Sequence, residues 1–301
     1  MRYQQVDVFS VEPLGGNPVA VVHDAEGLTS DRMQRFTRWT NLSEAAFLLP
    51  PTVGEADYRV RIFTQAGELP FAGHPTLGTC HAWLHVGGQP RDPDLIVQQC
   101  PAGLVPVRRE LEGLAFRAPP ILRSGPVAEE DLERISGILG IDRGEIVDHQ
   151  WVDNGPGWVA VKLASAEAVL ALSPLSDGGG PIDIGVVGPY PAGSECAYEV
   201  RAMFSDERGE LVEDPVTGSL NASLAQWLIG SGRVAAPYLA SQGTALGRTG
   251  RPRISQDADG SIWVGGATHT IVDGQLELDG SEPERAERDV SDGEASGRPA
   301  G

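Results

Sequence analysis

Lysine is almost absent from this chain. Lys162 is the single lysine among the 23 basic residues, which leaves a Schiff-base mechanism with almost no candidate. The phosphate-binding motif GxxxxGK(S/T) is also absent, and GPGWVA at 155–160, a truncated resemblance to a phosphate loop, lacks the third glycine. We therefore expect no bound nucleotide.

Positive charge as a whole is scarce. The 301 residues carry 42 acidic and 23 basic side chains, a formal charge of −19 at pH 7. A surface this negative repels phosphate backbones and anionic lipid headgroups. The composition therefore argues against nucleic acid and against membranes as partners.

Cysteine is scarce, and long apolar runs are missing as well. Cys80, Cys100 and Cys196 are an odd number of cysteines without CxxC spacing, so we expect neither a disulfide framework nor a zinc site. No run of about 18 apolar residues occurs, and the first residues do not show a basic stretch followed by an apolar core. These absences predict a cytoplasmic protein.

What is present is the apolar periodicity of an α+β protein. Five helical patterns are predicted over about 29–39, 73–86, 128–138, 166–172 and 218–229, and capping residues or glycines mark the start of the first, second and fifth. Alternation or short apolar runs predict strands at 3–10, 17–24, 44–50, 58–64, 95–99, 104–110, 114–119, 157–163, 182–189 and 197–205. We expect a first half at 1–118, a second half at 119–280, and a disordered acidic tail at 281–301 that is almost without apolar side chains.

Two segments, one in each half, are similar in sequence. AGHPTLGTCHAWL at 72–84 and VTGSLNASLAQWL at 216–228 align at an offset of 144 residues, and each begins a helix at a small residue. If these helices open toward one cleft, their free N–H groups and positive dipole ends would attract a small carboxylate between them. This internal sequence similarity therefore suggests a duplicated domain with an anion site at the junction.

Groups able to move protons lie near these helix starts. His74 is close to the first start, Asp214 and Ser219 are close to the second, and Glu44 follows the Asn-Leu-Ser helix breaker at the beginning of a strand. In an apolar setting, loss of water would raise the pKa of Glu44 toward the range useful for a general acid or base. Each residue also has an ordinary interpretation: a surface carboxylate, a helix cap, a helix-entry acid or a first-turn serine.

Two other chemistries use residues of this set or a nearby histidine pair. A serine hydrolase built from Ser219, His74 and Asp214 lacks the GxSxG elbow, and its Asp and Ser would share one loop. His81 and His85 are spaced i, i+4 as metal ligands can be, but no HExxH motif accompanies them. We favour neither, and we expect no metal.

Several segments in a fixed order resemble the phenazine-biosynthesis PhzF-like isomerase family across about residues 1–280. They are DVF with GNPVAVV, NLSEAAF (41–47), RIFTQAGELPFAGHPTLGT (61–79), DNGPGWVAV (153–161), EDPVTGS (213–219) and ALGRTGRPRIS (245–255). The resemblance implies the diaminopimelate-epimerase-like fold. In that fold two similar halves each wrap a curved, mostly antiparallel sheet around a central helix, and the active site lies in the cleft between them.

The resemblance also implies roles for individual residues. Glu44 would be the acid/base that takes a proton from one carbon and returns it to another, with His74 and Asp214 as polar cleft residues that assist. The substrate-binding residues would be Gly73, Thr76, Gly218 and Ser219. The sequence departs from the two-cysteine racemases of this fold, because His74 and Asp214 stand where thiols would be needed. It also carries Gln65 where many relatives have a proline-containing turn.

The function that follows from the resemblance is cofactor-independent isomerisation of a small unsaturated carboxylate like trans-2,3-dihydro-3-hydroxyanthranilate. The setting would be antibiotic or other secondary-metabolite biosynthesis, and the protein would be a homodimer. Two alternatives stay open. One is isomerisation or epimerisation of another amino-acid-derived substrate, and the other is a non-catalytic protein that binds small carboxylates.

Overall fold

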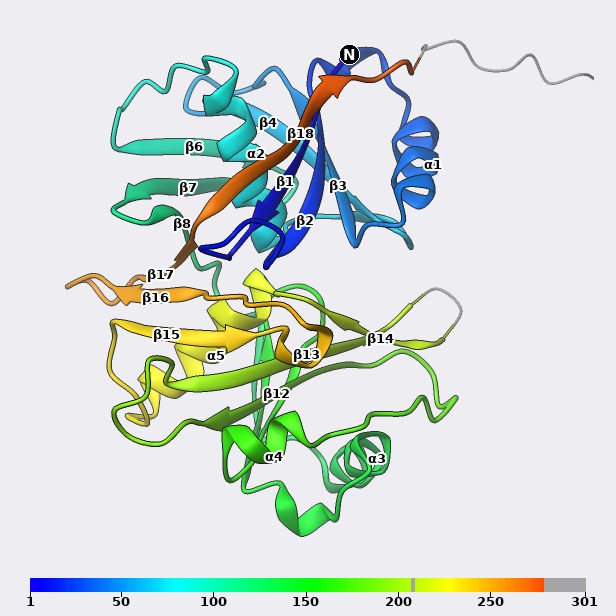
Figure 1. Cartoon of the computed structure of the whole chain (residues 1–301), viewed down its shortest axis with the longest axis vertical. Helices are drawn as coiled ribbons and strands as arrows, with labels where there is room; N and C mark the ends of the chain where they lie inside the picture. Colours follow the sequence, from blue (N-terminus) through cyan, green and yellow to red (C-terminus); the bar gives the residue numbers. More distant parts are fainter. Residues whose placement is uncertain (207–208, 279–301) are drawn as a thin grey trace, which may run out of the picture.

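The computed structural model describes residues 1–206 and 209–278, arranged as two lobes of sheet and helix stacked along the longest axis (Figure 1). In the first lobe a curved sheet surrounds the central helix α2 (Gly73–His85). Neighbouring strands follow the order β18 (Thr268–Gln275), β1 (Arg2–Val8), β2 (Asn17–Val22), β3 (Glu44–Leu49), β4 (Tyr58–Thr64), β6 (Leu95–Cys100), β7 (Gly103–Glu110), β8 (Gly113–Arg117) and β17 (Ile262–Gly266). Only the β2–β3 and β4–β6 pairs in this series are parallel.

The second lobe repeats this plan around α5 (Gly218–Gly230). Its strands follow the order β9 (Arg123–Gly125), β10 (Asp148–Asp153), β11 (Val159–Lys162), β12 (Asp183–Pro189) and β13 (Tyr198–Ser205). Both β14 (Leu211–Asp214) and β15 (Tyr238–Gln242) pair with β13, and β15 continues through β16 (Arg253–Gln256) to β17. The predicted α+β architecture of two halves is confirmed.

The remaining elements lie outside these sheets or extend their edges. They are α1 (Ser30–Thr40), α3 (Glu129–Leu139), α4 (Ala166–Leu170), the two-residue strand β5 (Glu68–Leu69), and the 3-10 turns η1 (Ala25–Gly27), η2 (Arg143–Glu145) and η3 (Thr244–Leu246). Among the described residues no helix is long and apolar enough to cross a membrane.

The end of the described chain returns to the first lobe. β17 pairs with β8, and β18 pairs with β1 along its whole length, from Arg2–Gln275 to Val8–Thr268. Part of the segment that the sequence assigned to the second half therefore completes the sheet of the first. An alternating strand pattern specifies which face is buried but not which strand is the partner, so the sequence contained no signal for this return.

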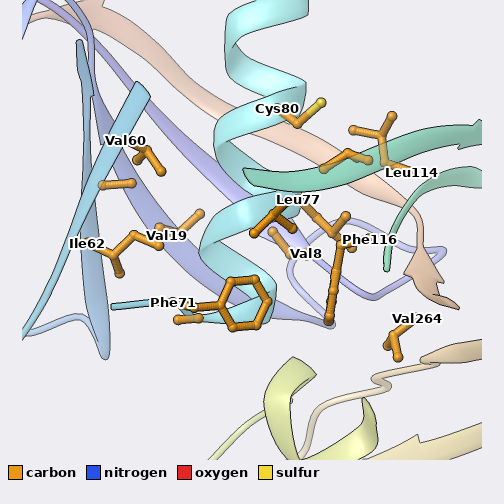
Figure 2. Close-up of a cluster of buried hydrophobic side chains, with 14 of the residues drawn as sticks. Val8, Val19, Val60, Ile62, Phe71, Leu77, Cys80, Leu114, Phe116 and Val264 are labelled. Atoms are coloured by element: carbon orange, nitrogen blue, oxygen red, sulfur yellow. The ribbon is translucent and has the colours of Figure 1, made fainter. Parts of the chain in front are cut away.

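The central helix α2 is buried because the sheet covers it nearly all round. Every residue from Gly73 to Cys80 is buried, as expected for a helix that is apolar or small on all faces. Leu77 is fully buried, and the rings of Phe71 and Phe116 meet edge to face with centroids 5.4 Å apart near the start of the helix (Figure 2). Burying a side chain the size of Leu77 contributes roughly 2 kcal/mol to folding. This packing fixes where the first turn of α2 points.

Candidate active site

The two central helices begin against each other at the junction of the lobes. Gly73 opens α2 and Gly218 opens α5, and a Cβ atom built on Gly73 would lie 2.7 Å from the Cα atom of Gly218. Only glycine allows this approach of backbone to backbone. The sequence separation of these two glycines is one residue larger than the 144-residue offset between the two similar segments. At that offset the tryptophans of the segments align, and the glycines do not.

These helix starts are suited to bind an anion. Within the described chain neither first turn contains an acidic residue, and neither Ala72 nor Thr217 caps its helix with a side-chain hydrogen bond. The first backbone N–H groups of a helix have no partner within the helix, and the dipole places positive potential there. Two such ends in contact therefore favour a carboxylate group placed between them.

Glu44 is held at the first position of β3 beside this junction. Asn41 ends α1 in the left-handed conformation, with φ of 57°, and the strand that follows pairs Glu44 with Thr64 on β4. The Glu44 side chain is 14% exposed, and its Oε2 atom lies 3.4 Å from Nε2 of His74. Within the part of the chain that the structure describes, neither of these two atoms has a hydrogen-bond partner. The hydrogen-bonding capacity of these two buried atoms is therefore unused.

Burial shifts the pKa values of Glu44 and His74 in opposite directions. The pKa of Glu44 is raised well above its usual value, first by loss of water and then by the negative charge of Asp214. The pKa of His74 is lowered to about 3, because burial disfavours its cation. At neutral pH His74 is therefore uncharged, and its contact with Glu44 is not an ion pair.

His74 is held by polar groups of β2. A hydrogen bond with the Pro18 backbone raises the pKa of His74, against the larger effect of burial. The Nδ2 group of Asn17 lies 3.3 Å from Nδ1 of His74 and also donates to Asp214 Oδ1 at 2.8 Å and to the Val216 carbonyl at 3.0 Å. These contacts orient the ring so that Nε2 faces Glu44.

Asp214, at the end of β14, is the second buried carboxyl of the site. It accepts hydrogen bonds from Thr217 Oγ1 at 2.6 Å, Asn17 Nδ2 at 2.8 Å and Ser43 Oγ at 3.3 Å. Burial raises its pKa to about 6, while these three donors act in the opposite direction. Glu44 and Asp214 thus share one buried site, but only Asp214 is surrounded by donors. Environments that differ in this way separate the proton affinities of two carboxyls.

Ser219 in the first turn of α5 is held as a hydrogen-bond donor. Its Oγ atom accepts from the indole Nε1–H of Trp158 at 3.1 Å, which occupies a lone pair and leaves the hydroxyl proton available. Asn154 fixes the backbone of the same residue by donating to its carbonyl at 2.9 Å. The predicted carboxylate contact of Ser219 fits this arrangement and stays a prediction.

Thr76 is placed differently from the other predicted binding residues. It is fully buried in α2, where its hydroxyl donates to the Ala72 carbonyl at 2.8 Å and accepts from Gln98 Nε2 at 2.9 Å. Both interactions are internal to the protein. We therefore assign Thr76 to the support of the first turn of α2, and its predicted contact with substrate remains untested.

The cysteines and the spaced histidines lie apart from these carboxyls. Cys80 is fully buried within α2, and burial raises the pKa of its thiol to about 12, far from the low pKa that a catalytic thiolate needs. Both ring nitrogens of His81 face hydroxyls of β18, Thr268 and Thr270, each at 2.8 Å. In residues 1–206 and 209–278 no group of three or more His, Cys, Asp or Glu side chains is arranged to hold a metal. His81 therefore ties α2 to the sheet.

Sequence reasoning named the reacting groups but missed the residues that orient them. Those residues stand within the motifs that carried the family resemblance, so the signal was present without an assignment. They are Asn17, Ser43, Asn154, Trp158 and Thr217. The unusual Gln65 also has a local role, because its side-chain amide donates to the Leu42 carbonyl at 3.1 Å and supports the segment that leads to Glu44.

Comparison with known proteins identifies the family. The sequence profile of the family described as phenazine biosynthesis-like protein matches residues 6–274. The chain belongs to this PhzC/PhzF family. It is 36% identical over 263 residues to trans-2,3-dihydro-3-hydroxyanthranilate isomerase of Pseudomonas aeruginosa, covering 83% of this chain and 88% of that one. It is 34% identical over 294 residues to antisense-enhancing sequence 1 of Schizosaccharomyces pombe, covering 91% and 97%.

Solved structures agree with this assignment. A predicted epimerase from Pseudomonas aeruginosa superposes with a TM-score of 0.77 at 27% identity, covering 92% of this chain and 99% of that one. A probable proline racemase from Agrobacterium radiobacter has a TM-score of 0.57 at 13% identity, covering 94% of each chain, which shows the shared fold. As a PhzC/PhzF member whose relatives are named isomerases or epimerases, the protein is an isomerase.

Proposed function

We propose that this isomerase moves a proton between two carbons of a small unsaturated carboxylate, with Glu44 as the group that removes the proton and returns it. The observation that carries the proposal is the grouping of Glu44, His74 and Asp214, largely shielded from water, beside two helix starts in contact. A buried carboxyl of raised pKa is a stronger base toward carbon than a solvated one, and it still donates a proton near neutral pH.

The reaction needs no atom that these residues do not supply. The substrate carboxylate would lie between the starts of α2 and α5, with the hydroxyl of Ser219 as an additional donor. Ionised Glu44 takes a proton from one carbon, and the electron pair of the broken C–H bond shifts along the adjacent double bond. Glu44 then donates that proton to the carbon at the far end. The substrate and product are isomers, and Glu44 returns to its initial state.

His74 and Asp214 would bind the polar groups around this path. Neutral His74 offers the Nε2 lone pair as an acceptor for the protonated form of Glu44 or for a substrate hydroxyl. Asp214 offers a carboxylate as an acceptor for a substrate amine or hydroxyl. These acceptors opposite an anion-binding helix pair favour a substrate that carries a carboxylate and a hydrogen-bond donor.

Trans-2,3-dihydro-3-hydroxyanthranilate, the compound in the name of the Pseudomonas relative, has these groups, and we propose it or a similar amino carboxylate of a secondary-metabolite pathway as the substrate. Proton NMR of this compound with the enzyme in D₂O tests the proposal. We expect loss of the diene signals and partial retention of the transferred proton, because a shielded carboxyl exchanges slowly with solvent. Saturable binding without any turnover would refute the proposed chemistry. A homodimer, suggested by the family resemblance, belongs to the same proposal.

Ser219→Ala is expected to weaken substrate binding more than turnover. Loss of one hydrogen bond to a charged group costs about 1.5 to 3 kcal/mol, so KM should rise on the order of 10- to 100-fold with kcat changed far less. Ser223→Ala is the matched control, because Ser223 is buried one turn later in α5 and donates to the Leu220 carbonyl at 3.1 Å. Steady-state kinetics of both variants decide. An unchanged KM in Ser219→Ala would remove this residue from the binding site.

A further inference from the structure

A chain of buried hydrogen bonds lies behind Asp214 and ends on its carboxylate. Gln242, on β15, is fully buried and contacts the turn between β14 and α5 at several points. Its Oε1 atom accepts from the backbone N–H of Thr217 at 3.0 Å and from Nδ2 of Asn221 at 2.7 Å. Its Nε2 atom donates to Thr217 Oγ1 at 3.0 Å and to the Asp214 carbonyl at 3.3 Å.

The donors that point at Gln242 determine the direction of this series of hydrogen bonds. Because two N–H groups point at Oε1 of Gln242, the amide has a single sensible orientation, with its Nε2–H groups toward Thr217 and the Asp214 carbonyl. Thr217 therefore accepts a hydrogen bond from Gln242, and its own proton is directed to Asp214 Oδ2 at 2.6 Å. A hydroxyl that has to donate in this way stabilises an ionised carboxylate more strongly than a protonated one.

The other carboxyl of the site has no such support. Oε2 of Glu44 has no donor among the described residues, whereas Asp214 also accepts from Asn17 and Ser43. We propose that Gln242 and Thr217 are positioning residues that keep Asp214 ionised, so that a proton taken up by the site, from the substrate or from water, is held by Glu44 and not by Asp214. This inference rests on the proposed function only in giving Glu44 the transferred proton, and the proton distribution itself is measurable without a substrate.

The charged and titratable groups that face this pair are few. Glu44 comes from β3, His74 from α2, and Glu213 precedes Asp214 on β14. His74 is uncharged at neutral pH, and Glu213 is bound by both ends of the Arg201 guanidinium, at 2.7 and 3.0 Å. A titration near neutral pH at this site is therefore the joint titration of Glu44 and Asp214.

The test compares Thr217→Val with Thr217→Ser. Valine keeps the shape but removes the hydroxyl, while serine keeps the donor. Carboxyl ¹³C NMR of the substrate-free protein, labelled at Asp and Glu and assigned with Glu44→Gln and Asp214→Asn, follows both groups with pH. In Thr217→Val we expect the Asp214 transition to move to higher pH by about one pH unit, the effect of losing one hydrogen bond to a carboxylate. Thr217→Ser should titrate like the wild type.

Gln242→Glu provides a second test in case Thr217→Val does not fold. The new carboxylate oxygen would accept the Thr217 proton instead of donating to Thr217, and its negative charge acts in the same direction, so Asp214 should again titrate at higher pH. If either variant folds and Asp214 titrates as in the wild type, the inference is overturned. This readout does not depend on turnover, so an enzyme inactive on every substrate tried would contradict the proposed function and leave the proton assignment standing on its own result.

Discussion

Glu44→Gln is expected to abolish isomerisation while the protein stays folded and still binds carboxylates. The amide has the same shape as the carboxyl, but it can neither take a proton from carbon nor return one. General acid–base catalysis typically contributes 10²- to 10⁴-fold, and here one group performs both steps, so kcat should fall about 10³-fold or more. Turnover followed by NMR in D₂O should show neither loss of substrate signals nor incorporation of deuterium.

The same variant has a predictable effect on stability. Because burial raises the pKa of folded Glu44, the favourable contribution of its protonated form is present below the unfolded pKa and is lost as pH rises through the folded value. Glutamine does not titrate, so Glu44→Gln should gain stability over the wild type as pH increases. Glu68→Gln is the control, since Glu68 is a partly exposed carboxylate paired with Arg61. A Glu44→Gln enzyme with more than about a tenth of wild-type kcat would contradict the assignment of this residue.

The sequence was sufficient for the fold because its local patterns and its motifs agree. The helical segments at 73–86 and 218–229 are apolar or small on all sides, which is the pattern of a buried central helix, and the structure places α2 and α5 there. The strands whose predictions were confirmed are those with clear alternation or short apolar runs. The partner of β18 could not be predicted, because its pairing with β1 joins residues at least 260 positions apart and alternation does not encode the partner strand.

The candidate site was predictable only as far as its reactive groups. Glu44, His74 and Asp214 were named because acids and histidines have chemistry of their own, and the structure brings them together. Asn17 and Gln242 are neutral amides, which carry no such signal in a sequence. Asn17 meets Asp214 across 197 positions of the chain. The ordering of proton affinities within the site depends on these long-range donors, so it required coordinates.

Gly73→Ala is expected to damage catalysis severely, although the change adds only one methyl group. The new Cβ would lie 2.7 Å from Cα of Gly218 and 2.8 Å from Cζ of Phe116, where ordinary contacts are 3.4–4 Å. Backbone atoms cannot rotate away, so α2 and α5 have to separate by about 1 Å. A misplacement of this size costs roughly 10²-fold in rate, and the overpacking costs about 1 to 3 kcal/mol of stability.

Gly137→Ala separates this local collision from the general effect of alanine in a helix. Gly137 lies in α3, and no described atom stands within 4 Å of a Cβ built there. Alanine at this position should raise stability by about 0.5 to 1 kcal/mol and leave kcat/KM unchanged. Denaturant unfolding and steady-state kinetics of the two variants make the comparison. Since the starts of α2 and α5 are expected to bind the substrate carboxylate together, a Gly73→Ala enzyme with wild-type kcat/KM would show that their contact does not set the geometry of the reaction.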